Sequence, residues 1–143
     1  PFGSIHPRAH VKADRLILGA RATVYGEPDV NYRGPAIDRC LITRYQEQSV
    51  LRVDYKHLAG GIYLKSYNGF EILTTGSIAW IPTEIITVTE DKQSVLVTLP
   101  SPPDIKILGV RYAWAHHPCE YKSCAVYSVN NDLPSPQDIC FIP

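Results

Sequence analysis

Residues 51–56 have the sequence Leu-Arg-Val-Asp-Tyr-Lys, in which apolar and charged side chains alternate strictly. Successive side chains of a β-strand point to opposite faces of its sheet, so this alternation indicates a strand with one buried and one solvated face. Leu51, Val53 and Tyr55 are therefore expected in the core. Antiparallel sheets tolerate water on one face, so the stretch favours an antiparallel sheet.

Later segments continue the same pattern. Gly60-Gly61 and Asn68-Gly69 are typical of turns, and the apolar runs between such turns are short. Several short strands without a second helix predict an antiparallel β-sandwich, so the chain is expected to be mostly β. Beyond 51–56, the expected strands are 62–64, 70–72, 95–99 and a final long strand from Ile105 to Trp114.

The first part of the chain has a different period. Between residues 9 and 25, apolar residues recur at steps of three and four, which predicts one amphipathic helix. Gly26 suits its C-terminal end. A helix this short is marginal alone and needs a partner surface. We therefore divide the chain into residues 1–27, containing this helix, and residues 28–143, containing the sandwich.

Composition excludes some function classes. Fourteen Lys and Arg balance fourteen Asp and Glu, and no basic cluster occurs, which argues against nucleic acid as a partner. No apolar run approaches the length of a membrane span. The chain contains no methionine and begins with Pro1, so we expect a processed piece of a longer precursor that stays associated with the remainder.

The four cysteines form an even set, which fits an oxidising compartment. Cys119 and Cys124 enclose four residues, a short loop that a disulfide can close. Cys40 and Cys140 then pair by elimination and join the first β segment to the C-terminal tail.

A zinc site is the less favoured interpretation of the same region. His116 and His117 precede Cys119 and Cys124, but adjacent histidines in extended chain point in different directions. The usual ligand spacing is also missing. We expect no metal and no cofactor.

His6 is the candidate catalytic residue. It is followed by Pro7 at the entrance to the expected helix, a placement that suits a general base. An unperturbed imidazole titrates near neutral pH, which fits that role. The 143 residues contain no recognisable nucleophile for such a base. Trp80 and Trp114 have two interpretations, a sugar site or core packing, and we expect core packing.

Six segments together resemble the C-terminal part of the sialate O-acetylesterase family. They include Ser-Ile-His-Pro around His6, Gly-Val-Arg-Tyr-Ala-Trp ending at Trp114, and Pro-Cys-Glu-Tyr-Lys-Ser-Cys ending at Cys124. The segments are 4–7, 16–26, 68–72, 109–114, 118–124 and 133–136.

The resemblance implies an SGNH-type esterase, with an α/β domain joined to a β-sandwich. Residues 1–27 then correspond to the last loop and helix of the α/β domain, and His6 matches the catalytic histidine. The serine nucleophile lies upstream of Pro1, on a partner chain of the same precursor. The acid often found two or three residues before the histidine is missing, because Gly3 and Ser4 occupy those positions.

The function implied is hydrolysis of O-acetyl esters on sialic acids, in a secreted or lysosomal enzyme that is incomplete without its N-terminal chain. The substrate is then an O-acetylated sialoglycan. Two alternatives from other classes are a catalytically inactive relative that serves as a secreted glycan-binding or structural module, and a free-standing recognition sandwich. The apolar face expected on the N-terminal helix counts against the last, since it needs a covering domain.

Overall fold

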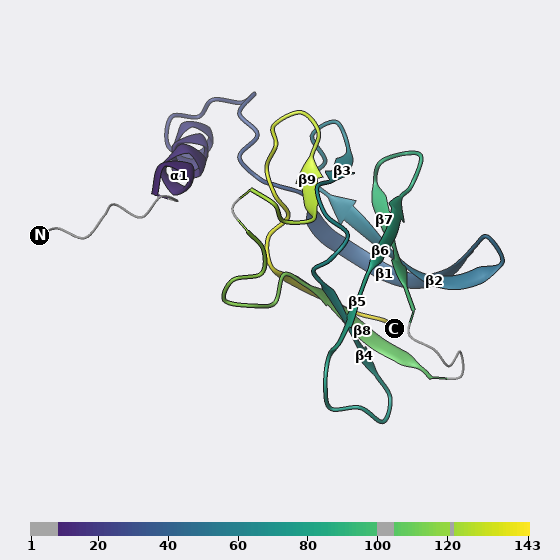
Figure 1. The fold of residues 1–143 in the computed structure, drawn as a ribbon. Helices are drawn as coiled ribbons and strands as arrows, with labels where there is room; N and C mark the ends of the chain where they lie inside the picture. Colours follow the sequence, from purple (N-terminus) through teal and green to yellow (C-terminus); the bar gives the residue numbers. More distant parts are fainter. Residues whose placement is uncertain (1–8, 100–104, 121) are drawn as a thin grey trace, which may run out of the picture. The chain divides into compact units, whose positions relative to one another are not determined.

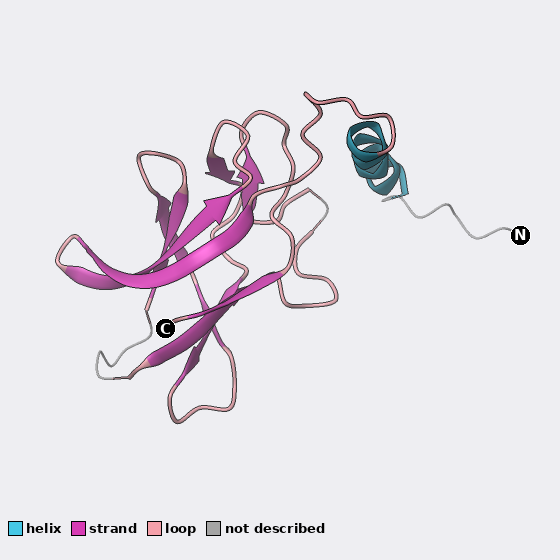
Figure 2. Ribbon diagram, turned by 180° about the vertical axis from the view of Figure 1, so that it is seen from behind, coloured by secondary structure: helices cyan, strands magenta, loops and turns pink. Residues whose placement is uncertain are grey.

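The computed structural model describes residues 9–99, 105–120 and 122–143. The chain forms two compact units, Pro1–Arg33 and Gly34–Pro143. Among the described residues, the first unit contains one helix, and the strands of the second pair antiparallel (Figures 1 and 2).

The helix α1 spans Ala9–Thr23, close to the range expected from the sequence. Its last turn is closed by a hydrogen bond from the Val24 N–H to the Ala20 carbonyl at 2.8 Å. Gly26 follows with φ 67°, a left-handed conformation that glycine adopts without strain and that ends helices.

Gly34–Pro143 contains two four-stranded sheets and a small two-stranded one. The strand order is β1-β2-β7-β6 in the first sheet, β10-β8-β4-β5 in the second and β3-β9 in the third. Figures 1 and 2 show the two larger sheets as two layers. The strands are β1 Ala36–Tyr45, β2 Gln48–Lys56, β3 Ile62–Leu64, β4 Phe70–Thr74, β5 Ile81–Thr83, β6 Ile85–Val88, β7 Ser94–Thr98, β8 Ile107–Tyr112, β9 Val126–Ser128 and β10 Asp138–Phe141.

The core lies between the two larger sheets. Leu51 and Val53 of β2 are fully buried, and they belong to one apolar cluster with Ile72 of β4 and Val110 of β8. Mutual burial of the inner faces is the main force that holds two such layers together. The mostly β, antiparallel sandwich expected from the sequence is therefore confirmed.

Two details of the strand prediction were wrong. The strand expected from Ile105 to Trp114 ends earlier, at Tyr112, because Ala113 has φ 54° and leaves the extended conformation. It is also not the final strand, since β10 from the C-terminal tail pairs with β8 as an edge strand of its sheet.

The outward face of β2 is also less exposed to solvent than the alternation of apolar and charged residues indicates. Asp54 was expected to be solvated but is only 8 % exposed. β2 lies between β1 and β7, and the side chains of Arg39 on β1 and Ser94 on β7 cover the Asp54 carboxylate.

Candidate functional site

His6, the candidate catalytic residue, lies outside the described residues. Among the described residues, no helix is both long and apolar enough to cross a membrane. In the described part of the sandwich, the features that could carry chemistry include disulfides, pockets and clusters of charged side chains.

Both cysteine pairs expected from the sequence are present as disulfides. Cys40 of β1 is bonded to Cys140 of β10, with their Cα atoms 6.1 Å apart. Because β1 and β10 belong to different sheets, this bond clamps the two layers together. The Ile37 N–H also donates to the Asp138 carboxylate at 3.2 Å and links the same two strands.

The second disulfide joins Cys119 to Cys124 and closes the loop after β8. Since both thiols are used in this bond, neither is available as a zinc ligand. The neighbouring His116 and His117 are exposed and lie edge to face, 4.4 Å between ring centroids. No three His, Cys, Asp or Glu side chains of residues 9–99, 105–120 and 122–143 come together in a way that could hold a metal ion.

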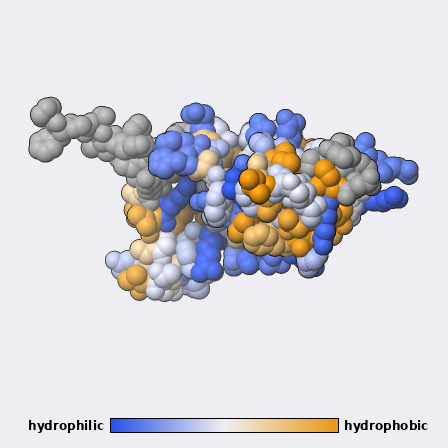
Figure 3. Space-filling model, turned by 90° about the horizontal axis from the view of Figure 1, so that it is seen from below, coloured by the Kyte–Doolittle hydropathy of each residue, from blue (hydrophilic) through white to orange (hydrophobic). Residues whose placement is uncertain are grey.

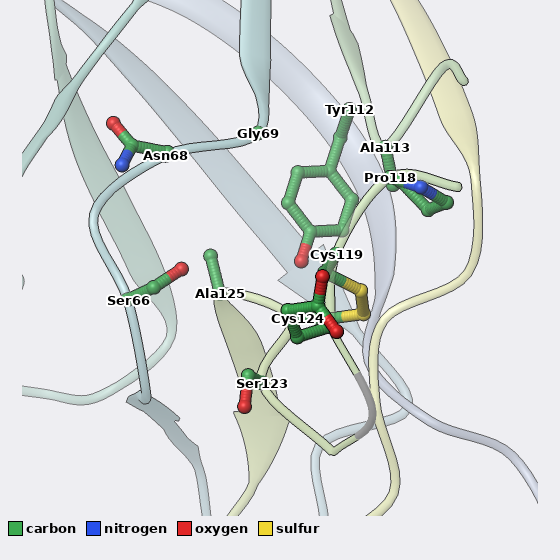
Figure 4. Close-up of a pocket in the computed structure, with 11 residues that line it drawn as sticks. Ser66, Asn68, Gly69, Tyr112, Ala113, Pro118, Cys119, Ser123, Cys124 and Ala125 are labelled. Atoms are coloured by element: carbon green, nitrogen blue, oxygen red, sulfur yellow. A yellow bond between two sulfur atoms is a disulfide. The ribbon is translucent and has the colours of Figure 1, made fainter. Parts of the chain in front are cut away.

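A pocket of about 190 Å³ lies beside this disulfide loop. Figure 4 shows the Tyr112 ring within it, between Gly69 and the Cys119–Cys124 bond. The Tyr112 hydroxyl accepts a hydrogen bond from the Val126 N–H at 3.1 Å. Burial raises the pKa of this phenol, so it remains a neutral hydrogen-bonding group that fixes the pocket wall.

A cluster of charged and aromatic side chains lies on the outer face of the second sheet. Arg111 of β8 and Glu71 of β4 occupy directly opposite register positions. The Arg111 Nε and Nη2 atoms donate to the two Glu71 carboxylate oxygens at 2.7 and 3.1 Å. The guanidinium carbon lies 4.6 Å from the ring centroid of Trp80 and 5.9 Å from that of Trp114.

The expectation that both tryptophans pack in the core is wrong. Trp80 is half-buried and Trp114 is 43 % exposed. The reason is position: Trp80 directly precedes β5 and Trp114 follows β8, so both lie at strand ends beside the outward-facing Arg111.

A second charged cluster surrounds Asp54. Its carboxylate accepts hydrogen bonds from Arg39 at 2.5 Å, Arg52 at 2.6 Å and the Ser94 hydroxyl at 2.6 Å. Burial alone raises the pKa of Asp54, but these three donors outweigh it, and the net pKa is lowered. The cluster ties β1, β2 and β7 together and has a structural role.

The third cluster lies beside the small β3-β9 sheet. Lys65 forms an ion pair with Asp132 at 2.7 Å, and its ammonium lies 3.8 Å from the Tyr127 ring centroid. Burial lowers the pKa of Lys65, but hydrogen bonds to Asp132 and Tyr63 overcome it and raise the pKa. The lysine therefore stays charged, which suits an anchor rather than a base.

Sequence reasoning missed the Arg111–Glu71 pair. The available signal was the strand alternation, which places Glu71 and Arg111 outward between the buried pairs Phe70/Ile72 and Val110/Tyr112. That pattern does not say which outward residues face each other across two strands.

Comparisons with known proteins place the chain in a family. Residues 41–141 match the family model described as the sialate O-acetylesterase C-terminal domain. The sialate O-acetylesterases of Pongo abelii and Homo sapiens are each 36 % identical to the chain over 145 residues, which cover 99 % of the chain and 27 % of the relative. The mouse enzyme is 35 % identical over the same length and is covered to 26 %.

A solved structure has the same fold. The carbohydrate acetylesterase from Xanthomonas citri superposes with a TM-score of 0.64 at 20 % identity, covering 88 % of this chain and 26 % of that one.

The two sheets, their disulfide clamp and the family match define a C-terminal β-sandwich domain of an esterase. The chain belongs to the sialate O-acetylesterase family. It spans about a quarter of the length of the curated relatives it matches.

Proposed function

We propose that this chain is the C-terminal part of a secreted or lysosomal esterase that removes O-acetyl groups from sialic acids, with His6 as its catalytic base. The alignment with the human and orangutan sialate O-acetylesterases carries this proposal. The alignment covers 99 % of the chain, so His6 and its flanking residues lie within the aligned region.

The nucleophile is assigned to the part of the enzyme that precedes Pro1. Leu16 of α1 is 73 % exposed, and Ile17, Val24 and Tyr25 in and after the helix are also exposed. Exposed apolar side chains on a helix of fifteen residues favour a covering partner, since such a helix is marginal alone. A preceding α/β domain, on the same chain or on a processed partner chain, supplies that cover.

The chemistry follows from the division of roles. A serine hydroxyl becomes nucleophilic when His6 accepts its proton, and the oxygen then attacks the acetyl carbonyl. The bond from the acetyl carbon to the sugar oxygen then breaks, and His6 gives the proton to that oxygen, which leaves as a hydroxyl. A water molecule next hydrolyses the acetyl-enzyme by the same route. Because Gly3 and Ser4 carry no carboxylate, the group that orients the imidazole comes from the preceding domain or from a backbone carbonyl.

The disulfides support maturation of the enzyme in an oxidising compartment. Cys40–Cys140 closes a large loop and joins the two sheets, so the domain is built to mature where thiols are oxidised. This supports the proposed secreted or lysosomal location of the whole enzyme.

The test is acetate release from an O-acetylated sialic acid by the complete enzyme, produced with the segment that precedes Pro1. His6→Ala is expected to lower kcat/KM by at least about a thousandfold, because a triad base is lost. His10→Ala is the matched control on the same stretch and is expected to retain full activity.

Equal activities of the His6 variant and the parent would contradict the catalytic assignment. If the complete protein releases no acetate, the glycan-binding or structural alternative replaces the enzyme. Native mass spectrometry of the purified protein separates one continuous chain from two associated ones.

A further inference from the structure

The outer face of the β10-β8-β4-β5 sheet carries a preformed group of side chains that the esterase chemistry does not use. Glu71 and Arg111 face each other across β4 and β8, and Pro82 of β5 lies opposite Glu71 on its other side. These three residues form a row across the sheet. We call Glu71, Arg111, Trp80 and Trp114 the tryptophan–arginine cluster.

The cluster is held rigid. The two hydrogen bonds from Arg111 to Glu71 fix the plane of the guanidinium, which retains little rotational freedom. Trp80 and Trp114 both lie within 6 Å of that guanidinium, a distance at which cation–π attraction orients the rings. The arrangement therefore exists before any ligand arrives.

The cluster is open to solvent where it borders a pocket. A hollow of about 190 Å³ is lined by Glu71, Pro82, Trp114 and Pro118. Trp114 is 43 % exposed although it is one of the largest apolar side chains of the sandwich. Figure 3 shows apolar side chains exposed between polar ones on one face of the molecule.

We propose that the tryptophan–arginine cluster binds a neutral hexopyranose ring of a glycan. One face of such a ring consists of C–H bonds, which pack against an indole, while its hydroxyls lie around the edge. Trp114 provides the indole surface. The Glu71 carboxylate accepts from hydroxyls, and Arg111 donates with the N–H groups that Glu71 does not engage.

Charge selects the neutral sugar over an acidic one. Glu71 and Arg111 neutralise each other within hydrogen-bonding distance, so no net positive charge is left to attract a sugar carboxylate. The pocket volume suits one ring rather than a long chain. The cluster thus recognises a hexose of the glycan and not its sialic acid.

The experiment is saturation-transfer NMR and tryptophan fluorescence titration of the 143-residue chain with methyl β-galactopyranoside, methyl α-glucopyranoside and N-acetylneuraminic acid. Millimolar binding of at least one hexoside, and none of the acidic sugar, is expected. Trp114→Ala is expected to weaken that binding by about fivefold to tenfold, the worth of one aromatic contact. Trp114→Phe keeps an aromatic face and is expected to retain most of it.

Phe141→Ala is the matched control, because Phe141 is an exposed aromatic on the opposite edge strand of the same sheet. Its variant is expected to bind as the parent does. Absence of hexoside binding, tighter binding of the acidic sugar, or equal affinities of the Trp114→Ala variant and the parent would each overturn the proposal. So would complete protection of Trp114 from acrylamide quenching in the complete enzyme, since the cluster would then be an internal interface. Because binding is measured without ester cleavage, the result is independent of His6.

Discussion

Removing the Cys40–Cys140 disulfide is expected to destabilise the sandwich far more than removing Cys119–Cys124. The first bond joins residues 100 positions apart and the second joins residues 5 apart. A cross-link stabilises by restricting the unfolded chain, and the effect grows with the logarithm of the loop length. The expected losses of unfolding free energy are about 4.7 kcal/mol and about 2 kcal/mol respectively.

The two bonds also differ in what they hold. Cys40–Cys140 connects β1 to β10 and so links the two sheets, whereas Cys119–Cys124 closes a local loop after β8. Without Cys40–Cys140, only non-covalent packing holds the two sheets together. This loss adds to the entropic difference of about 2.7 kcal/mol between the two disulfides.

The assay is urea unfolding followed by far-ultraviolet circular dichroism, comparing the Cys40→Ala/Cys140→Ala and Cys119→Ala/Cys124→Ala double variants with the parent. Equal losses in the two variants, or a larger loss from the short loop, would refute the reasoning. It would mean that the unfolded chain is already compact enough to make the long link redundant.

Four further predictions concern three buried polar groups and one turn. Asp54→Asn is expected to cost about 2 kcal/mol at neutral pH through weaker charged hydrogen bonds. The fold lowers the pKa of Asp54, so this stabilisation is present above the unfolded value of about 3.9 and is lost as the pH falls below it. Urea unfolding of parent and variant should therefore converge in acid, and a constant gap would contradict the assignment. The buried Tyr55 hydroxyl lies near Ser135 but makes no hydrogen bond of good geometry to a described residue, so Tyr55→Phe should change stability by less than about 1 kcal/mol. Tyr112→Phe should cost about 1–3 kcal/mol because it leaves the buried Val126 N–H without an acceptor. A larger fall in melting temperature for Tyr55→Phe than for Tyr112→Phe would contradict both assignments. Gly61 has φ 92°, so Gly61→Ala should lower stability by about 1–3 kcal/mol, and an unchanged melting temperature would show that the turn relaxes.

The sandwich was predictable because its signals are local. Alternation over residues 51–56 and the turn at Gly60-Gly61 concern neighbours in the chain, and both Gly60 and Gly61 have positive φ in the structure. The helix of residues 9–23 was likewise visible from its period. The end of β8 was not, because Ala113 adopts a left-handed conformation that alanine rarely takes and that no sequence pattern announces.

The tryptophan–arginine cluster could be predicted from the sequence only in part. Trp80 and Trp114 stood out as residues able to contact sugar, but their exposure depends on which strands end beside Arg111. Nothing near Arg111 in the sequence indicates that Glu71, 40 residues earlier, is its partner.

By itself, the sequence determined the antiparallel sandwich, the short loop closed by Cys119 and Cys124, and the resemblance that pointed to the esterase family. Each of these depends on residues that lie close together in the chain or in a recognisable order. Only the tertiary structure decided that Asp54 is buried among donors and that Glu71 neutralises Arg111 beside the half-buried Trp80 and the exposed Trp114. The register of distant strands is set by how the whole core packs, and the sign and number of partners around a charge follow from that register.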